Sequence, residues 1–198
     1  MKRLVILTFP VLLFICACHT TPPKDVQEQK SATDTAKKNY LPVQDFLKAE
    51  IAAVDSFPFK LMRYRTSQNR TDSAIITTEI FNQLAKEFLL PDLDSSRFEK
   101  KFEENSFVDR STNLVSFTYS TKDSSYGLKR VDVLLSQVGG IDRLNSIYME
   151  AISGNADSTL IRKLSWKAGR NFRILQINKP RNGPETSTQT LVVWDSRD

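Results

Sequence analysis

The chain has 198 residues, one histidine, two cysteines and a formal net charge of +5, which falls to +3 without Lys2 and Arg3. This length suits a single domain with a full hydrophobic core, and this charge does not point to nucleic acid as a partner. The histidine and both cysteines lie within residues 16–19, so the sequence excludes a disulfide, a Ser-His-Asp triad, a Cys-His pair and a histidine-based zinc site from the remainder.

The first residues have the composition of an export signal. Met1-Lys2-Arg3 is a basic start, and the apolar run up to Ala17 is too short to span a membrane. Ile15-Cys16-Ala17-Cys18 resembles the lipobox of bacterial lipoprotein signal peptides, in which a small residue precedes the lipidated cysteine. This resemblance implies that residues 1–17 are a signal peptide and that Cys18 is the lipidated N-terminus. The alternative is an ordinary secretory signal with two incidental cysteines.

Residues 18–39 predict a flexible tether, because they are rich in polar residues and too poor in large apolar groups to offset the entropy of ordering. Surface-exported lipoproteins of the Bacteroidota carry acidic residues directly after the lipidated cysteine, whereas His-Thr-Thr-Pro follows Cys18 here. We therefore expect an outer-membrane anchor that faces the periplasm. Asp34-Thr35-Ala36 resembles the short O-glycosylation motif of the same phylum, so Thr35 is a candidate modification site.

The first predicted helix has Pro42 at its first position, and apolar side chains recur at helical spacing from Val43 to Val54. Phe57-Pro58 ends this pattern. A strand is expected over residues 59–64, and a polar turn over residues 68–72.

Two further helices are predicted. Thr78 is placed to cap the second, whose apolar stripe runs from Ile80 to Leu89. Ser96 and Glu99 have capping-box spacing at the start of the third. The apolar stripe of the second helix needs a core to face.

After Phe107 the apolar period changes to two, as in strands with one buried face. Strands are predicted at residues 115–120, 130–135, 147–152, 159–166, 172–177 and 189–194. The turns between them are short, so sequential strands must be antiparallel neighbours. The sequence therefore predicts a single α+β domain over residues 40–198, with N-terminal helices packed on one face of a curved antiparallel meander sheet.

Carboxylates are the remaining candidates for acid-base catalysis, because the expected domain has no histidine or cysteine. The pairs considered are Asp92 with Asp94, Glu103 with Glu104, and Asp109 with Asp132. Their spacing singles out none of them, and Asp92 and Asp94 lie between two predicted helices, where acidic residues commonly serve as caps. No catalytic residue, metal or cofactor is assigned.

A run without acidic residues separates Asp157 from Glu185. Its candidate anion- or partner-binding residues are Arg162, Lys163, Lys167, Arg170 and Arg173. Lipid A phosphates, anionic headgroups and an acidic protein are the ligand classes that such a patch suits. The alternative is a solvated face paired with acids on neighbouring strands.

Arg162 differs from the other basic residues because it lies two and four positions from the apolar Leu164 and Trp166. In a strand, this spacing places all three side chains on the same face. An arginine on a buried face needs a partner. We expect an internal salt bridge to Glu150 or Asp132, and the alternative is a ligand.

Several hydrophobic fragments resemble parts of uncharacterised Bacteroidota envelope lipoproteins of about this length. These fragments are Phe46 to Ile51, Arg130 to Leu134, Ile147 to Glu150 and Leu164 to Gly169. The resemblance supports compartment and fold, and it implies no activity. The leading hypothesis is a lipid-anchored, non-enzymatic envelope module that binds a partner protein or a ligand. The alternatives are a carrier of a lipid or other amphiphile in a cavity under the sheet, and a carboxylate-based hydrolase.

Overall fold

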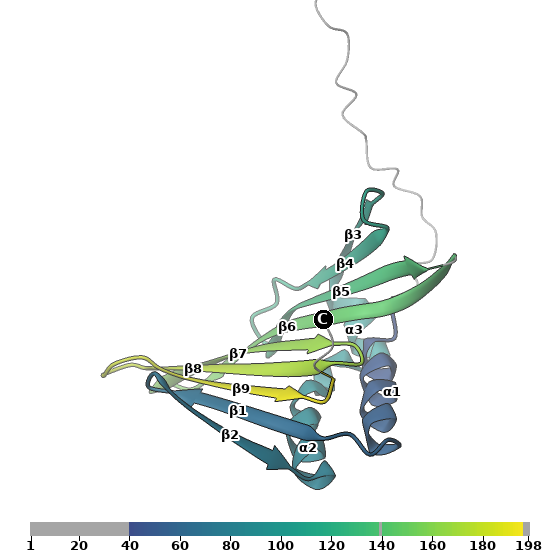
Figure 1. The fold of residues 1–198 in the computed structure, drawn as a ribbon. Helices are drawn as coiled ribbons and strands as arrows, with labels where there is room; N and C mark the ends of the chain where they lie inside the picture. The colour runs from purple at the N-terminus through teal and green to yellow at the C-terminus, as the bar shows by residue number, and fades with distance from the viewer. Residues whose placement is uncertain (1–39, 139, 196–198) are drawn as a thin grey trace, which may run out of the picture. The chain divides into compact units, whose positions relative to one another are not determined.

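The computed structural model describes residues 40–138 and 140–195. The predicted signal peptide, Cys18, the tether and Thr35 lie outside the described residues. Within the described part, N-terminal helices precede a nine-stranded antiparallel sheet (Figure 1). The predicted α+β architecture is therefore confirmed.

The helical elements come first, interrupted by one hairpin. They are α1 (Val43–Asp55), α2 (Thr78–Ala85), the 3-10 turns η1 (Lys86–Phe88) and η2 (Pro91–Leu93), and α3 (Ser95–Lys101). The strands are β1 (Leu61–Ser67), β2 (Arg70–Ile76), β3 (Glu103–Asp109), β4 (Leu114–Ser120), β5 (Leu128–Val138), β6 (Ile141–Gly154), β7 (Ser158–Lys167), β8 (Asn171–Pro180) and β9 (Thr186–Val193).

The strand order is β2-β1-β9-β8-β7-β6-β5-β4-β3. Strands β3 to β9 follow one another as the predicted meander, because short turns make consecutive strands neighbours. The β1–β2 hairpin, which precedes the meander in the chain, joins it through antiparallel pairing of β1 with β9. The first and last strands thus lie side by side.

Two strands escaped the sequence prediction, and both are edge strands. Gln68 and Asn69 have positive φ angles of 49° and 61° and form the tight turn that closes the β1–β2 hairpin. The predicted turn over residues 68–72 was therefore too long, since β2 begins at Arg70. The other missed strand is β3. Edge strands bury little side-chain surface, so the alternation that marks a half-buried strand is weak in both.

The helix caps differ from those predicted. The Thr77 hydroxyl accepts a hydrogen bond from the backbone N–H three residues later, so α2 is capped one residue before Thr78. Asp94 accepts the Ser96 N–H at 3.1 Å and caps α3. The predicted capping box from Ser96 to Glu99 was wrong, because a residue already inside the helix cannot act as its N-cap.

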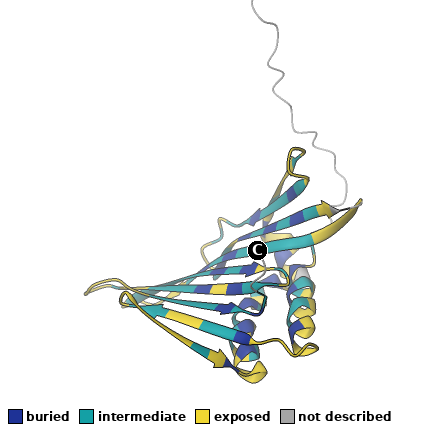
Figure 2. Cartoon of the chain, in the orientation of Figure 1, coloured by how far each residue is buried: buried dark blue, intermediate teal, exposed yellow. Residues whose placement is uncertain are grey.

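One face of the sheet, here called the inner face, packs against the helices (Figures 1 and 2). Trp166, Phe172 and Val192 are in register across β7, β8 and β9, and none is more than 1% exposed. Phe81 of α2 lies with its ring centroid 5.5 Å from that of Phe172. The Phe88 ring of η1 lies 5.1 Å from Trp166. These aromatic contacts form the centre of the core.

Polar contacts also fasten the N-terminal elements to the sheet. On α1, Glu50 Oε2 accepts hydrogen bonds from Trp166 Nε1 at 3.2 Å and from the Gly169 N–H at 2.7 Å. Gly169 occupies the β7–β8 turn with a φ of +66°, a conformation that favours glycine. The Leu41 N–H donates to the Tyr119 hydroxyl at 3.1 Å. The helices consequently stay on the inner face, and the opposite face is left open.

Candidate functional site

The face of the sheet opposite the helices is here called the outer face, and no helix in the described part of the chain covers it (Figure 1). Along β7, the buried Leu164 and Trp166 alternate with Lys163, Ser165 and Lys167, which are not buried. Figure 2 shows the same alternation of buried and more accessible positions in the central strands. The outer face is therefore an uncovered surface on which partner-binding residues can gather.

Three of the predicted binding residues do gather on the outer face. Lys163 and Lys167 flank Ser165 on β7, and Arg173 on β8 lies directly opposite Ser165. We call Lys163, Lys167 and Arg173 the outer basic patch. Within the described part of the chain, none of the three forms an ion pair. Three long cationic side chains thus surround one small residue and are free to bind an anion.

Acidic residues on the neighbouring strands have other partners. Asp132 is paired with Arg130, whose Nε lies 2.8 Å from Asp132 Oδ2. Glu150 accepts a hydrogen bond from the Tyr148 hydroxyl at 3.3 Å. Burial, followed by the charge of Glu150, raises the pKa of Tyr148, so this phenol stays a neutral donor. The alternative of a solvated face paired with acids therefore does not describe the outer basic patch, although Lys179 of the same basic run pairs with Glu185 at 3.0 Å.

The other two predicted residues lie elsewhere. Arg162 is opposite the buried Ala151 on the inner face, whereas Glu150 is opposite Lys163 on the outer face. The predicted salt bridge of Arg162 to Glu150 or Asp132 was wrong, because both acids project from the opposite side of the sheet. The buried Nε of Arg162 has no hydrogen-bond partner. Arg170 lies in the β7–β8 turn, where its backbone N–H donates to the Lys167 carbonyl at 3.1 Å.

An aliphatic row adjoins the outer basic patch. Ile152, Ile161 and Ile177 are in register across β6, β7 and β8. All three are partly accessible, and Ile161 lies two residues from Lys163 on the same face. The outer face thus carries partly accessible apolar side chains beside unpaired cations.

Two of the candidate catalytic carboxylates, Asp92 and Asp94, hold backbone N–H groups. Asp92 Oδ2 accepts the Leu128 N–H at 3.0 Å, which ties η2 to β5. Asp94 caps α3. Glu103 and Glu104 are consecutive in β3, so their side chains point to opposite faces of the sheet.

Asp109 and Asp132 also lie apart. Asp109 is at the end of β3 and accepts hydrogen bonds from the Ser111 N–H and hydroxyl at 2.9 and 2.6 Å. These bonds, together with those from Thr112, lower the pKa of Asp109 to about 2. Asp132 belongs to β5, two strands away. Neither member of this pair faces the other across a cleft.

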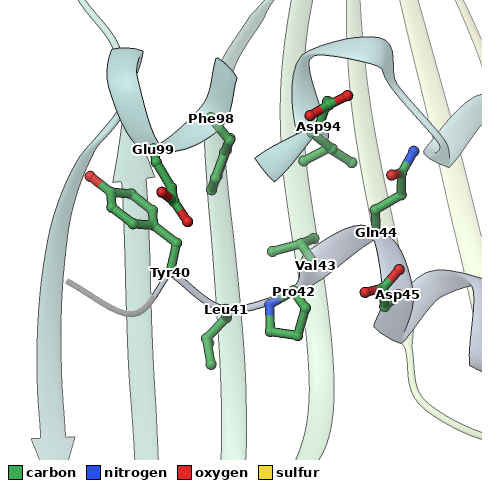
Figure 3. A pocket seen from close by; sticks show the side chains of 10 residues that line it. Tyr40, Leu41, Pro42, Val43, Gln44, Asp45, Asp94, Phe98 and Glu99 are labelled. Atoms are coloured by element: carbon green, nitrogen blue, oxygen red, sulfur yellow. The ribbon is translucent and has the colours of Figure 1, made fainter. Parts of the chain in front are cut away.

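A hollow of about 240 Å³ lies where the described chain begins, between the start of α1 and α3 (Figure 3). Three carboxylates line it, those of Asp45, Asp94 and Glu99, and Asp94 is already engaged as the α3 cap. The hollow is acidic and contains none of the predicted binding residues, so it is not the predicted anion site.

The space under the sheet at α2 is occupied by aromatic rings. Phe81, Phe88, Trp166 and Phe172 contact one another, with ring centroids between 5.1 and 6.4 Å apart. In residues 40–138 and 140–195, no cluster of three or more metal-binding side chains is present, and no helix is long and apolar enough to cross a membrane. The packed rings give the amphiphile-carrier hypothesis no preformed space at this point.

Sequence reasoning missed a second basic cluster, on the inner face. Arg63 and Arg65 of β1 are two residues apart, in register with Val192 and Thr190 of β9. They line a hollow of about 220 Å³ at the edge of η1. Only their alternation with Met62 and Tyr64 hinted at a polar stretch on this face, and nothing in the sequence placed β1 beside β9.

A comparison of the chain with protein-family models, curated proteins and solved structures finds no match.

Proposed function

We propose that the protein is a non-enzymatic envelope module, lipid-anchored through Cys18 to the periplasm-facing side of the outer membrane, whose outer face binds an acidic partner protein. The observation that carries this proposal is the outer basic patch. Its three cations share one uncovered surface around Ser165, and none of them is neutralised by an ion pair within the described residues.

The surface supplies both kinds of interaction that a protein interface uses. The unpaired cations steer an acidic partner and fix its orientation. The aliphatic row of Ile152, Ile161 and Ile177 supplies apolar area that loses water on contact. A row of this kind on a pleated surface favours a folded protein over a free ion.

The predicted tether fits this role. A flexible segment of the length of residues 18–39 has an average end-to-end distance of about 25 Å. The domain would then search a shell of that depth above the bilayer, and its outer face would be free to turn towards a partner. Anchoring raises the effective concentration of the module near other proteins of the same membrane, so a lower affinity for its partner suffices.

Site-specific photo-crosslinking in cells tests the binding surface. A photoreactive residue replaces Ile161, and the matched control carries it at Gln83, an exposed position on α2. We expect an acidic protein to be captured from position 161 only. Combined Lys163→Glu and Arg173→Glu substitutions should lower the yield about tenfold, which corresponds to about 1.4 kcal/mol.

Charge reversal elsewhere is the control for that result. Arg97→Glu, which changes an exposed cation on α3, should leave the yield unchanged. An equal yield from the patch variant, or capture from Gln83 alone, would show that the outer face is not the interface.

The anchor is tested separately by metabolic labelling with an alkyne fatty acid. Cys18→Ala should abolish the label, and Cys16→Ala should retain it. Retention of label after Cys18→Ala would refute the assignment of Cys18.

A further inference from the structure

The hollow on the inner face combines donors from three adjacent strands. Arg63 and Arg65 come from β1, Thr188 and Thr190 from β9, and Gln176 from β8. Gln176 and Thr188 are direct neighbours in register, and so are Thr190 and Arg65. We propose that this hollow is a binding site for a phosphate group. It is separate from the outer basic patch, because it opens on the opposite face of the sheet.

The hollow has more hydrogen-bond donors than acceptors. The Nε of Arg63 is buried and has no partner. One terminal nitrogen of Arg63 lies 3.5 Å from Asp72, whose side chain is 64% exposed. Arg65 forms no ion pair within the described residues. The positive charge of the two guanidinium groups is therefore only partly offset, and an oxyanion in the hollow would offset the remainder.

One carboxylate lines the hollow, and its position matters. Glu87 Oε2 accepts a hydrogen bond from Gln176 Nε2 at 3.3 Å. This carboxylate forms no ion pair with Arg63 or Arg65, although all three line the same 220 Å³ space. The two guanidinium groups are thus held near a carboxylate without being neutralised by it, and Glu87 should weaken the binding of an anion.

The arrangement of the donors favours phosphate over carboxylate. Guanidinium groups bind both anions with paired hydrogen bonds. Here the donor side chains project side by side from one face of the neighbouring strands β1, β9 and β8. A phosphate group has more oxygens than a carboxylate, so it can accept hydrogen bonds from more of these side chains at once. The phosphate is either a free ion or part of a lipid headgroup.

Isothermal titration calorimetry on the mature lipidated protein in neutral detergent tests the site. Inorganic phosphate, dihexanoyl phosphatidic acid below its micelle concentration, and acetate are titrated separately at constant ionic strength. We expect at least one phosphate probe to bind and acetate to bind about tenfold more weakly or not at all. Binding of the lipid alone assigns the site to a headgroup, and binding of both probes shows that the phosphate group suffices.

Three variants complete the test. Combined Arg63→Gln and Arg65→Gln substitutions should weaken phosphate binding by at least about tenfold, and the control Arg97→Gln should leave it unchanged. Glu87→Gln keeps a hydrogen-bonding side chain opposite Gln176 but removes a negative charge, so it should tighten binding several-fold. This gain requires a folded protein and thus separates a binding effect from a loss of structure. Absence of binding by both phosphate probes, or equal binding by wild type and the double-arginine variant, would overturn the proposal.

Discussion

Glu50→Ala should destabilise the domain although Glu50 belongs to neither proposed binding surface. Glu50 holds α1 against the β7–β8 turn through hydrogen bonds to Trp166 Nε1 and to the Gly169 N–H. Trp166 is 1% exposed, so its indole N–H depends on Glu50 for a hydrogen bond in the folded domain. The variant therefore loses two hydrogen bonds to a charged acceptor and leaves a buried donor without a partner.

The expected loss follows from these two contacts. A hydrogen bond to a charged group contributes about 1.5–3 kcal/mol, and Glu50 is partly accessible, so the lower end of that range applies to each bond. We expect the free energy of unfolding to fall by about 3 kcal/mol. Glu50→Gln retains an acceptor oxygen but loses the charge, and should cost about 1 kcal/mol. Lys48→Ala, an exposed change on the same helix, should stay within about 0.5 kcal/mol of wild type.

Urea unfolding of residues 18–198 carrying Cys18→Ser, followed by tryptophan fluorescence, measures these differences. The slope of the free energy against urea concentration should be the same for all variants. A double-mutant cycle with Trp166→Phe, which removes the indole N–H, should give a coupling energy of about 1 kcal/mol with Glu50→Ala. The reasoning fails if Glu50→Ala unfolds within about 0.5 kcal/mol of wild type.

Two further predictions concern the core. Phe81→Ala removes a fully buried ring and should lower the free energy of unfolding by about 3–5 kcal/mol, whereas Phe57→Ala, at a position that is 67% exposed, should cost less than about 1 kcal/mol; similar thermal midpoints for the two variants would contradict this. Burial raises the pKa of Tyr119 above its ordinary value of 10.0, so the stability due to its neutral form is complete below pH 10 and is lost as the pH rises above it. The urea midpoint should therefore fall above pH 10 in wild type and fall less in Tyr119→Phe, which at all pH values also loses the acceptor of the Leu41 N–H; parallel curves for the two proteins would refute the assignment to Tyr119.

The meander was predictable because its signals are local. Alternation of apolar and polar side chains marks a strand, and a short turn forces the next strand to be an antiparallel neighbour. Both signals are strong from β4 to β9. They are weak in β2 and β3, which lie at the edges of the sheet and bury little on either side.

The basic residues between Asp157 and Glu185 show what local sequence patterns cannot predict. Alternation assigned Arg162 correctly to the buried side of β7, in line with Leu164. Alternation could not identify the partner of Arg162. The pattern within one strand does not say on which face of the sheet a residue of another strand lies. The face depends on the register of the paired strands. The register of β5 against β6 shifts between Leu128 and Arg130 and again between Leu134 and Leu135. Alternation within β7 separates Arg162 from Lys163, and the pairing of β7 with β8 brings Lys163, Lys167 and Arg173 together.

The sequence by itself determined the class of fold, the order of the meander strands and the face on which each strand residue lies relative to its neighbours. Periodicity and turn length are properties of short segments, so they can be recognised without the rest of the chain. Only the tertiary structure decided that β1 pairs with β9, across more than a hundred residues. That pairing depends on the burial of one shared core, and it brings Arg63 and Arg65 beside Thr188, Thr190 and Gln176 to form the inner hollow.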